Sequence, residues 1–252
     1  MQTGAASIEV IAEGVGPLIV MLPSTGRDSD ADFDAVAAGL AVAGFRILRP
    51  QPRGCGHSVG PLDGITFHDF GRDIAAVIEA ERQGPAILLG HAFGNWIARV
   101  TAADHPQLAR GVILAAAAAK TSPTYLREVV AKCADTTLPD AERRQQLAIG
   151  FFAAGHDPSP WLDGWHPAVF ASQRRAGQST DRAKWWSAGR APILDLQAEL
   201  DPWRPEASRD ELVAELGSRV TVAMIAGASH ALLPERPAAV VAAVASWSRG
   251  LP

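Results

Sequence analysis

A five-residue segment with glycine at both ends, Gly90-His91-Ala92-Phe93-Gly94, constrains the fold of this 252-residue chain more than any other feature. An apolar run at 85–89 precedes it, and residues 95–100 continue with helical spacing, so the sequence predicts a strand, a sharp turn and a helix. The frame matches the nucleophile elbow G-x-S-x-G, whose small outer residues let strand and helix approach closely around a strained central residue. Alanine stands at that central position.

Two further residues fit a triad, whose order along the chain is nucleophile, acid, histidine in proteins with such an elbow. Residues 192–197 predict a strand, and Asp201 lies in the proline-rich turn after it. Residues 220–225 predict the next strand, and His230 follows it. Asp before Pro is usually turn chemistry, and a loop histidine is usually only solvated. Their order, spacing and strand-end positions nevertheless favour Asp201 as the acid and His230 as the base.

With these residues the chain resembles the α/β-hydrolase superfamily, in the branch of small esterases, lactonases and epoxide-hydrolase relatives. The resemblance covers nearly the whole sequence. Residues 51–58 match the family's D-x-R-G-x-G-x-S loop except that Gln51 replaces the aspartate, and residues 227–235 are similar to its histidine loop. Members of the family have Ser, Cys or Asp at position 92, so the departure concerns activity rather than fold.

The same resemblance implies an oxyanion hole. In the family, one backbone N–H comes from the residue after the nucleophile, which is Phe93 here. The other comes from the loop after the first core strand, here residues 23–27, with Ser24 as the expected donor. Both donors are backbone groups, so the alanine at position 92 does not remove them.

Alternating apolar strands and helical segments predict an α/β fold, with a mostly parallel central sheet flanked by helices. The alternation stops between residues 120 and 190, where Pro, Trp and charged residues mix. We therefore expect an α/β-hydrolase core from residues 1–119 and 191–252 and a helical cap at 120–190. Helices are expected at 30–43, 66–82, 95–105, 206–216 and 234–247, and helical patches at 125–134 and 140–153.

Four of the seven tryptophans lie inside the expected cap. A cap over the carboxyl ends of parallel strands covers the place where open α/β sheets bind ligands. The sequence therefore predicts an apolar pocket, with Trp161, Trp165 and Trp186 as substrate-binding residues together with His91 of the elbow. In the competing interpretation, the tryptophans form a small core of the cap itself.

Composition limits the partners. The formal net charge of −4 and the lack of basic runs argue against binding to nucleic acid. No apolar run approaches the roughly 20 residues of a membrane helix, and the first residues lack the features of a signal peptide. The two cysteines and the histidines show no spacing typical of a metal or redox motif. We expect a cytoplasmic monomer or homodimer that binds a small apolar substrate, with no cofactor, metal, nucleic acid or membrane.

Three interpretations of Ala92 remain open. In the first, an engineered alanine replaces the serine of an ester or lactone hydrolase that otherwise retains Asp201 and His230. In the second, the alanine is native, and the His230–Asp201 dyad performs non-covalent base chemistry, as in water activation, a lyase or a cofactor-free oxygenase. In the third, the protein is a pseudohydrolase that only binds a small ligand. Retention of both dyad residues favours catalysis, and the two catalytic interpretations both include hydrolysis.

Overall fold

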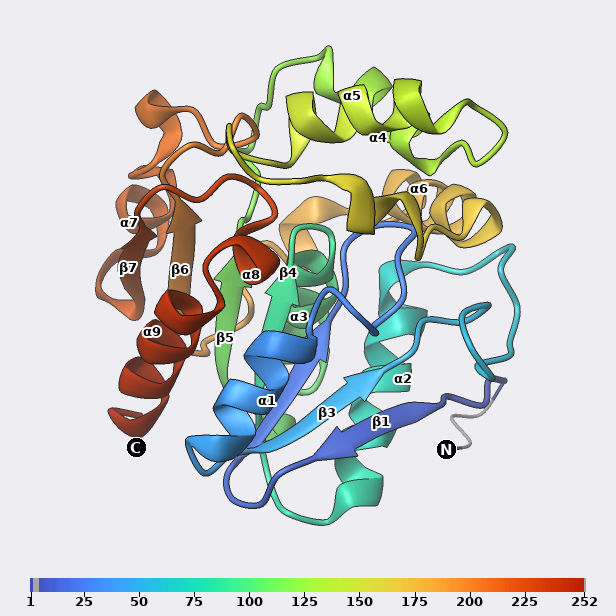
Figure 1. Ribbon diagram of the computed structural model, residues 1–252. Helices are drawn as coiled ribbons and strands as arrows, with labels where there is room; N and C mark the ends of the chain where they lie inside the picture. The colour runs from blue at the N-terminus through green and yellow to red at the C-terminus, as the bar shows by residue number, and fades with distance from the viewer. Residues whose placement is uncertain (2–4, 252) are drawn as a thin grey trace.

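The computed structural model, which describes residues 1 and 5–251, contains a seven-stranded sheet with the order β1-β3-β2-β4-β5-β6-β7. The strands are β1 Val10–Glu13, β2 Leu18–Leu22, β3 Arg46–Pro50, β4 Ala86–His91, β5 Ala109–Ala115, β6 Ile193–Ala198 and β7 Val220–Ile225. Neighbouring strands are parallel except β1 and β3, which pair antiparallel. The expected mostly parallel α/β sheet is therefore present (Figure 1).

Helices cover both faces of this sheet (Figure 1). They are α1 Asp34–Val42, α2 Phe67–Glu81, α3 Gly94–Asp104, α7 Glu211–Leu216, α8 Leu232–Glu235 and α9 Pro237–Arg249. Ile19 and Met21 of β2 pack with α1 and α9, whereas Val20 and Leu22 pack with α2 and α3. Every residue of β2 is buried, as expected for a parallel strand that is covered on both faces.

The structure differs from the expected elements at several points. The expected helix at 234–247 is divided into α8 and α9, because Pro237 lacks the N–H needed to continue α8 and instead fits the first turn of a new helix. The expected helix at 206–216 is divided into a 3-10 turn, Glu206–Ser208, and α7. The short, partly exposed strand β1 was not predicted, because four residues are too few for a clear strand pattern.

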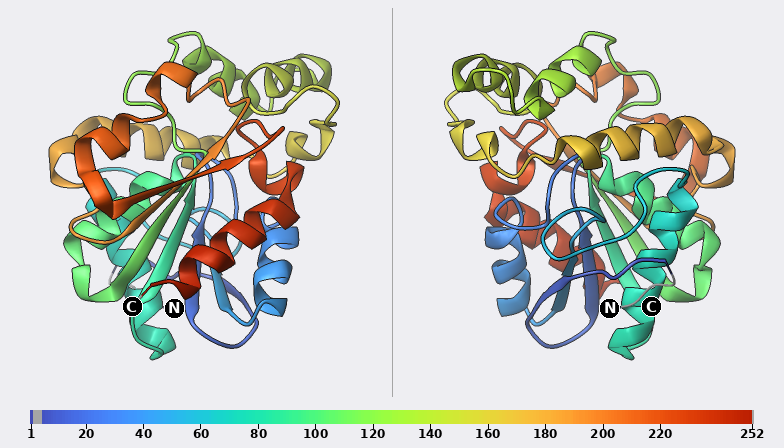
Figure 2. Two further views of the ribbon diagram at one scale, coloured as in Figure 1. Left: turned by 90° about the vertical axis from the view of Figure 1, so that its left-hand side faces the viewer. Right: turned by 90° about the vertical axis from the view of Figure 1, so that its right-hand side faces the viewer.

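The segment of residues 120–190, here called the cap segment, lies over the carboxyl ends of the strands (Figures 1 and 2). It contains α4 Leu126–Ala134, α5 Asp140–Gly150, α6 Pro167–Ser179 and the 3-10 turns η2 Ser159–Leu162 and η3 Arg182–Lys184. Side chains of α4, α5 and η2 form a small core of their own, centred on Phe151 and Trp161. The helix α6 was not among the predicted elements, and the division of the chain into a core and a cap domain stays a prediction.

The elbow has the geometry that its sequence predicts. The strand β4 ends at His91, α3 begins at Gly94, and Ala92 between them adopts a φ of 48°, in the left-handed region that L-residues rarely occupy. A Cβ on Gly94 would lie 2.1 Å from the carbonyl oxygen of Leu22. A Cβ on Gly90 would lie 2.3 Å from the backbone nitrogen of Asn95. Glycine at both ends therefore permits the contact of α3 with the sheet.

Gly94→Ala tests this close approach. We expect it to lower the free energy of unfolding by at least about 2 kcal/mol, because the new methyl group meets backbone that cannot move aside. Gly250→Ala is the matched control, since a Cβ there would meet its nearest atom at 3.4 Å, an ordinary contact. Chemical denaturation of both variants measures the difference, and equal losses would contradict the role assigned to Gly94.

Candidate active site

The structure brings Asp201 and His230 together. The imidazole Nδ1 of His230 lies 2.9 Å from Oδ2 and 3.1 Å from Oδ1 of Asp201, and both side chains are buried. A carboxylate only accepts hydrogen bonds, so Nδ1 carries the proton and Nε2 is left as the acceptor. Asp201 Oδ1 also accepts the backbone N–H of Trp203 at 2.8 Å. The pair therefore has the arrangement of a general base with an oriented imidazole.

The sheet explains why these two loops meet. The strands β6 and β7 are parallel neighbours in continuous register, so both loops begin at the same end of the sheet, where the strands have their carboxyl ends. Backbone hydrogen bonds then join the loops, from Glu199 N to Ile225 O at 3.1 Å and from Leu200 N to Ala228 O at 2.8 Å. These backbone hydrogen bonds help to hold Asp201 and His230, which are 29 positions apart in the sequence, in contact.

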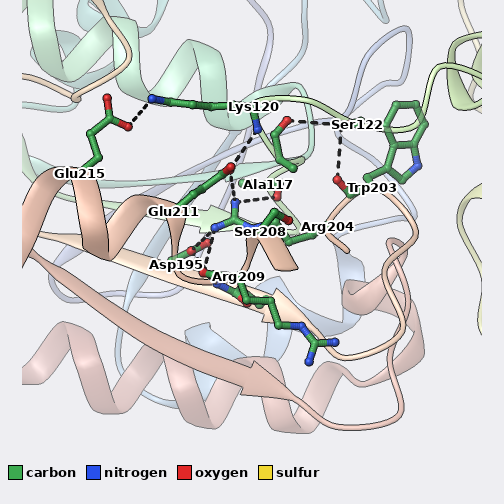
Figure 3. A network of polar contacts seen from close by, with 12 residues as sticks. Ala117, Lys120, Ser122, Asp195, Trp203, Arg204, Ser208, Arg209, Glu211 and Glu215 are labelled. Atoms are coloured by element: carbon green, nitrogen blue, oxygen red, sulfur yellow. Dashed lines mark hydrogen bonds and ion pairs between the residues drawn. The ribbon is translucent and has the colours of Figure 1, made fainter. Parts of the chain in front are cut away.

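A buried arginine anchors the loop after β6 that carries Asp201, here called the acid loop (Figure 3). Arg204 donates to Asp195 Oδ2 at 3.0 Å and forms an ion pair with Glu211 Oε1 at 3.2 Å. Its backbone N–H donates to the carbonyl oxygen of Asp201 at 3.1 Å, which ties the anchor to the acid. Burial raises the pKa of the Asp195 carboxyl, and the positive charge of Arg204 opposes that rise. Asp195 therefore serves this anchor and does not compete with Asp201 for His230.

His91 lies behind the dyad rather than in a substrate contact. Its Nε2–H donates to the backbone carbonyl oxygen of His230 at 2.8 Å. Burial, reinforced by the nearby imidazole of His230, lowers the pKa of His91 to about 3, so its ring is neutral at ordinary pH. The side chain is buried and does not line the cavity described next, so the predicted substrate contact of His91 was wrong. It instead holds the backbone of the histidine loop against the elbow.

A cavity of about 420 Å³ opens between the elbow, the loop after β2 and the cap segment, as predicted. Ala92, Phe93, Ser24 and His230 all line it, and its volume is in the range of small-ligand pockets. Among the described residues, no hydrogen bond engages the backbone N–H groups of Ser24, Phe93 or Thr25. These donors are therefore available to an oxyanion. Thr25, also on the lining, was not singled out from the sequence.

The three predicted tryptophans do not line this cavity, so their assignment to its wall was wrong. Trp161 and Trp165 cover the buried guanidinium of Arg27, at 4.4 and 5.0 Å from their ring centroids. Trp186 covers Arg99 at 4.1 Å. An aromatic face over a buried cation gains energy from the ring quadrupole, which explains their inward placement. The wall contains other tryptophans instead: Trp96, Trp185 and Trp203.

The cap segment holds the loop after β2, residues 23–27, through Gln173 of α6. Its Oε1 accepts the backbone N–H of Gly26 at 2.7 Å and the hydroxyl of Thr25 at 3.1 Å. The backbone N–H of His166 also donates to the carbonyl oxygen of Gly26 at 2.7 Å. Gln173 had no signal in the sequence, because its partners lie about 150 residues away and the contact exists only after folding.

Other reactive groups are not set up for this chemistry. Burial raises the pKa of the Cys55 and Cys133 thiols to about 12, so neither is a thiolate near neutral pH. The described residues contain no group of three or more His, Cys, Asp or Glu side chains that could hold a metal ion. Within the same residues, no helix has the length and apolar character needed to cross a membrane.

A family model and one of two relatives described next match this chain along most of its length. The family model for serine aminopeptidase, S33, matches residues 18–237. A pyrrolizixenacetamide deacetylase of Xenorhabdus hominickii is 23% identical over 245 residues, which cover 91% of this chain and 87% of that protein. A 2-(acetamidomethylene)succinate hydrolase of Mesorhizobium japonicum is 32% identical over 110 residues, which cover 44% of this chain and 39% of that protein.

Solved structures show the same fold. An esterase of Exiguobacterium antarcticum superimposes with a TM-score of 0.80 at 20% identity, and the match covers 97% of this chain and 96% of the esterase. A bromoperoxidase of Bacillus anthracis superimposes with a TM-score of 0.77 at 20% identity, over 97% and 96% of the two chains.

Arg204→Met tests the anchor of the acid loop. We expect the free energy of unfolding to fall by about 3–5 kcal/mol at about pH 8, because a buried carboxylate loses its main countercharge. The loss should shrink toward about pH 4. Burial raises the pKa of the Asp195 carboxyl and Arg204 opposes that rise, so the pKa is raised further in the folded variant than in the unchanged protein. A raised folded-state pKa contributes stability below the ordinary pKa, and this contribution is lost as the pH rises, so the variant loses more stability than the unchanged protein at high pH.

Denaturant unfolding across this pH range measures the effect. The double variant Asp195→Asn with Arg204→Met is the control, since it keeps Glu211 but no longer has the buried Asp195 carboxyl group that would titrate. A single variant whose loss of stability is independent of pH would contradict the assigned ion pair.

Proposed function

Because the chain belongs to the serine aminopeptidase S33 family of α/β hydrolases, we propose that it hydrolyses an ester or lactone bond of a small, largely apolar substrate, with water as the nucleophile. The observation that carries this proposal is the His230–Asp201 hydrogen bond beside a cavity that also contains Ala92. The base is oriented, and the side chain at the elbow cannot attack a carbonyl group. Water at the same place can.

The proposed step balances as a general-base hydrolysis. A water molecule between the Ala92 methyl and His230 gives a proton to Nε2, and its oxygen bonds to the carbonyl carbon. The negative charge moves to the carbonyl oxygen, which accepts from the backbone N–H groups of Phe93 and Ser24. When the bond to the alkoxide breaks, His230 returns the proton to it. The products are an acid and an alcohol, or a hydroxy acid from a lactone.

The magnitudes support slow but real catalysis. Triad enzymes that lose the nucleophile keep about 10³–10⁴-fold catalysis over water, from the oxyanion hole and substrate binding. A positioned general base contributes typically about 10²–10⁴-fold. Both contributions use groups that Ala92 leaves in place. The proposal thus favours the non-covalent use of the dyad over a protein that only binds a ligand.

Acetamides are the second substrate class to test. The names of two relatives include an acetamide: the pyrrolizixenacetamide deacetylase and the 2-(acetamidomethylene)succinate hydrolase. The same dyad and oxyanion donors serve an amide, but an amine leaves less readily than an activated alcohol. Activated aryl esters and strained lactones are therefore the first compounds in the assay.

Ala92→Ser separates water attack from covalent catalysis. The unchanged protein should hydrolyse an activated aryl ester without a burst of product. The serine variant should be faster by at least about a hundredfold and should show a burst, because an acyl-enzyme accumulates before water releases it. Stopped-flow absorbance at limiting and saturating ester measures both quantities.

His230→Ala is the control in both backgrounds. It should lower either rate by about 10²–10⁴-fold, because the hydroxyl and the water both need a base. Hydrolysis that is indifferent to His230 would refute the proposed mechanism. A lack of turnover in both the unchanged protein and the serine variant, combined with tight binding of a small ligand, would support the binding protein instead.

A further inference from the structure

Among the residues that the structure describes, three arginines and no carboxylate line the cavity. Arg127 belongs to α4, Arg174 to α6 and Arg182 to η3, so three separate elements of the cap segment each contribute an arginine to the lining of one cavity. All three residues are exposed. Within the described part of the chain, none of the three forms an ion pair. The chain as a whole carries a formal charge of −4, so this positively charged cluster is opposite in sign to the net charge of the protein.

Within the described residues, the lack of an ion pair at these arginines does not extend to the neighbouring Arg175. Arg175, the next residue of α6, pairs with Asp63 at 2.6 Å, whereas the Arg174 guanidinium carbon lies 5.6 Å from the centroid of the Phe170 ring. Arg182 lies 5.3 Å from the Trp186 ring and donates weakly to a backbone carbonyl oxygen. These aromatic contacts restrict the guanidinium groups without neutralising them.

Arg127 carries an additional electrostatic cost. It lies in the first turn of α4, where the helix dipole is positive and a cation is unfavourable by typically about 0.3–1 kcal/mol. An anion bound near this residue would remove that cost. It would also find two more guanidinium groups, each able to donate two parallel hydrogen bonds to an oxyanion.

We propose that the substrate carries an anionic oxyacid group, a carboxylate or a phosphate, at the end remote from the scissile bond, and that Arg127, Arg174 and Arg182 bind it. This inference rests on the proposed function, because it concerns the same cavity. The substrate class is therefore an acidic ester, lactone or amide with an apolar middle part, which lies between the arginines and the elbow. The positive opening also steers such anions toward the cavity, with a dependence on salt.

Binding without turnover tests this inference. Calorimetry on the unmodified full chain compares 4-phenylbutyrate with its neutral isostere 4-phenylbutanamide, and 3-phenylpropyl phosphate is the third ligand. We expect the carboxylate or the phosphate to bind about tenfold or more tightly than the amide at low salt, and we expect the difference to shrink as salt is added. The stronger of the two anions identifies the charged group.

Arginine variants locate the effect. Arg127→Gln with Arg174→Gln should abolish the preference for the anion. Arg190→Gln is the matched control, since Arg190 is exposed and lies outside the cavity lining, and it should keep the preference. A carboxylate bound at the oxyanion donors would keep its affinity in the double variant. Thermal unfolding of each variant verifies that it is folded.

The outcomes separate the two proposals. Equal affinity for anion and amide would overturn the inference, as would no measurable binding of any ligand or an equal loss in Arg190→Gln. Selective, arginine-dependent binding without hydrolysis of any ester would support the anion site and refute the proposed function. Hydrolysis of neutral and acidic esters at equal kcat/KM would support the proposed function and overturn the anion site.

Discussion

The left-handed turn at Ala92, between two glycines that leave no space for a Cβ, is the constraint on which the site depends. It brings the first turn of α3 against the carbonyl of Leu22 and places Phe93 on the lining of the cavity. A non-glycine residue in this region costs on the order of 1 kcal/mol or more in backbone energy. An ordinary strand–helix connection can avoid this backbone energy by placing no non-glycine residue in the left-handed region. Its presence beside an oriented imidazole is consistent with a turn that still serves chemistry.

Three buried arginines join the parts of the molecule around this turn. Arg204 holds the acid loop through Asp195. Arg99 joins α3 to the cap segment through the carbonyl of Trp186 at 2.8 Å, and Arg27 joins the loop after β2 to the cap segment through the carbonyl of Asp163 at 3.0 Å. Desolvation of such charges is expensive, so buried ion pairs contribute specific geometry more than net stability. In this chain they hold loops whose positions the parallel sheet alone does not define.

The sequence predicts the local parts of this site better than its walls. The elbow, Asp201 and His230 are recognisable because each depends on a short pattern at a strand end and on their order. Gln173, Trp185 and Trp203 are not, because their positions depend on packing between distant segments. Trp161 and Trp186 were misplaced because a sequence does not show which tryptophan covers a buried arginine. The cluster of Arg127, Arg174 and Arg182 was missed because exposed arginines are common, and only the folded cavity shows that they share an opening.

The contacts of Gln173 and His166 with Gly26 have a consequence for how ligands exchange. A cap that swings away as a lid would break the hydrogen bonds that hold the loop carrying Ser24 and Thr25. Each opening would therefore disorder the loop after β2, which would have to re-form before the next turnover. A cap that stays in place avoids this penalty but makes the opening a fixed aperture. The girth of a ligand, more than its length, then decides which molecules enter.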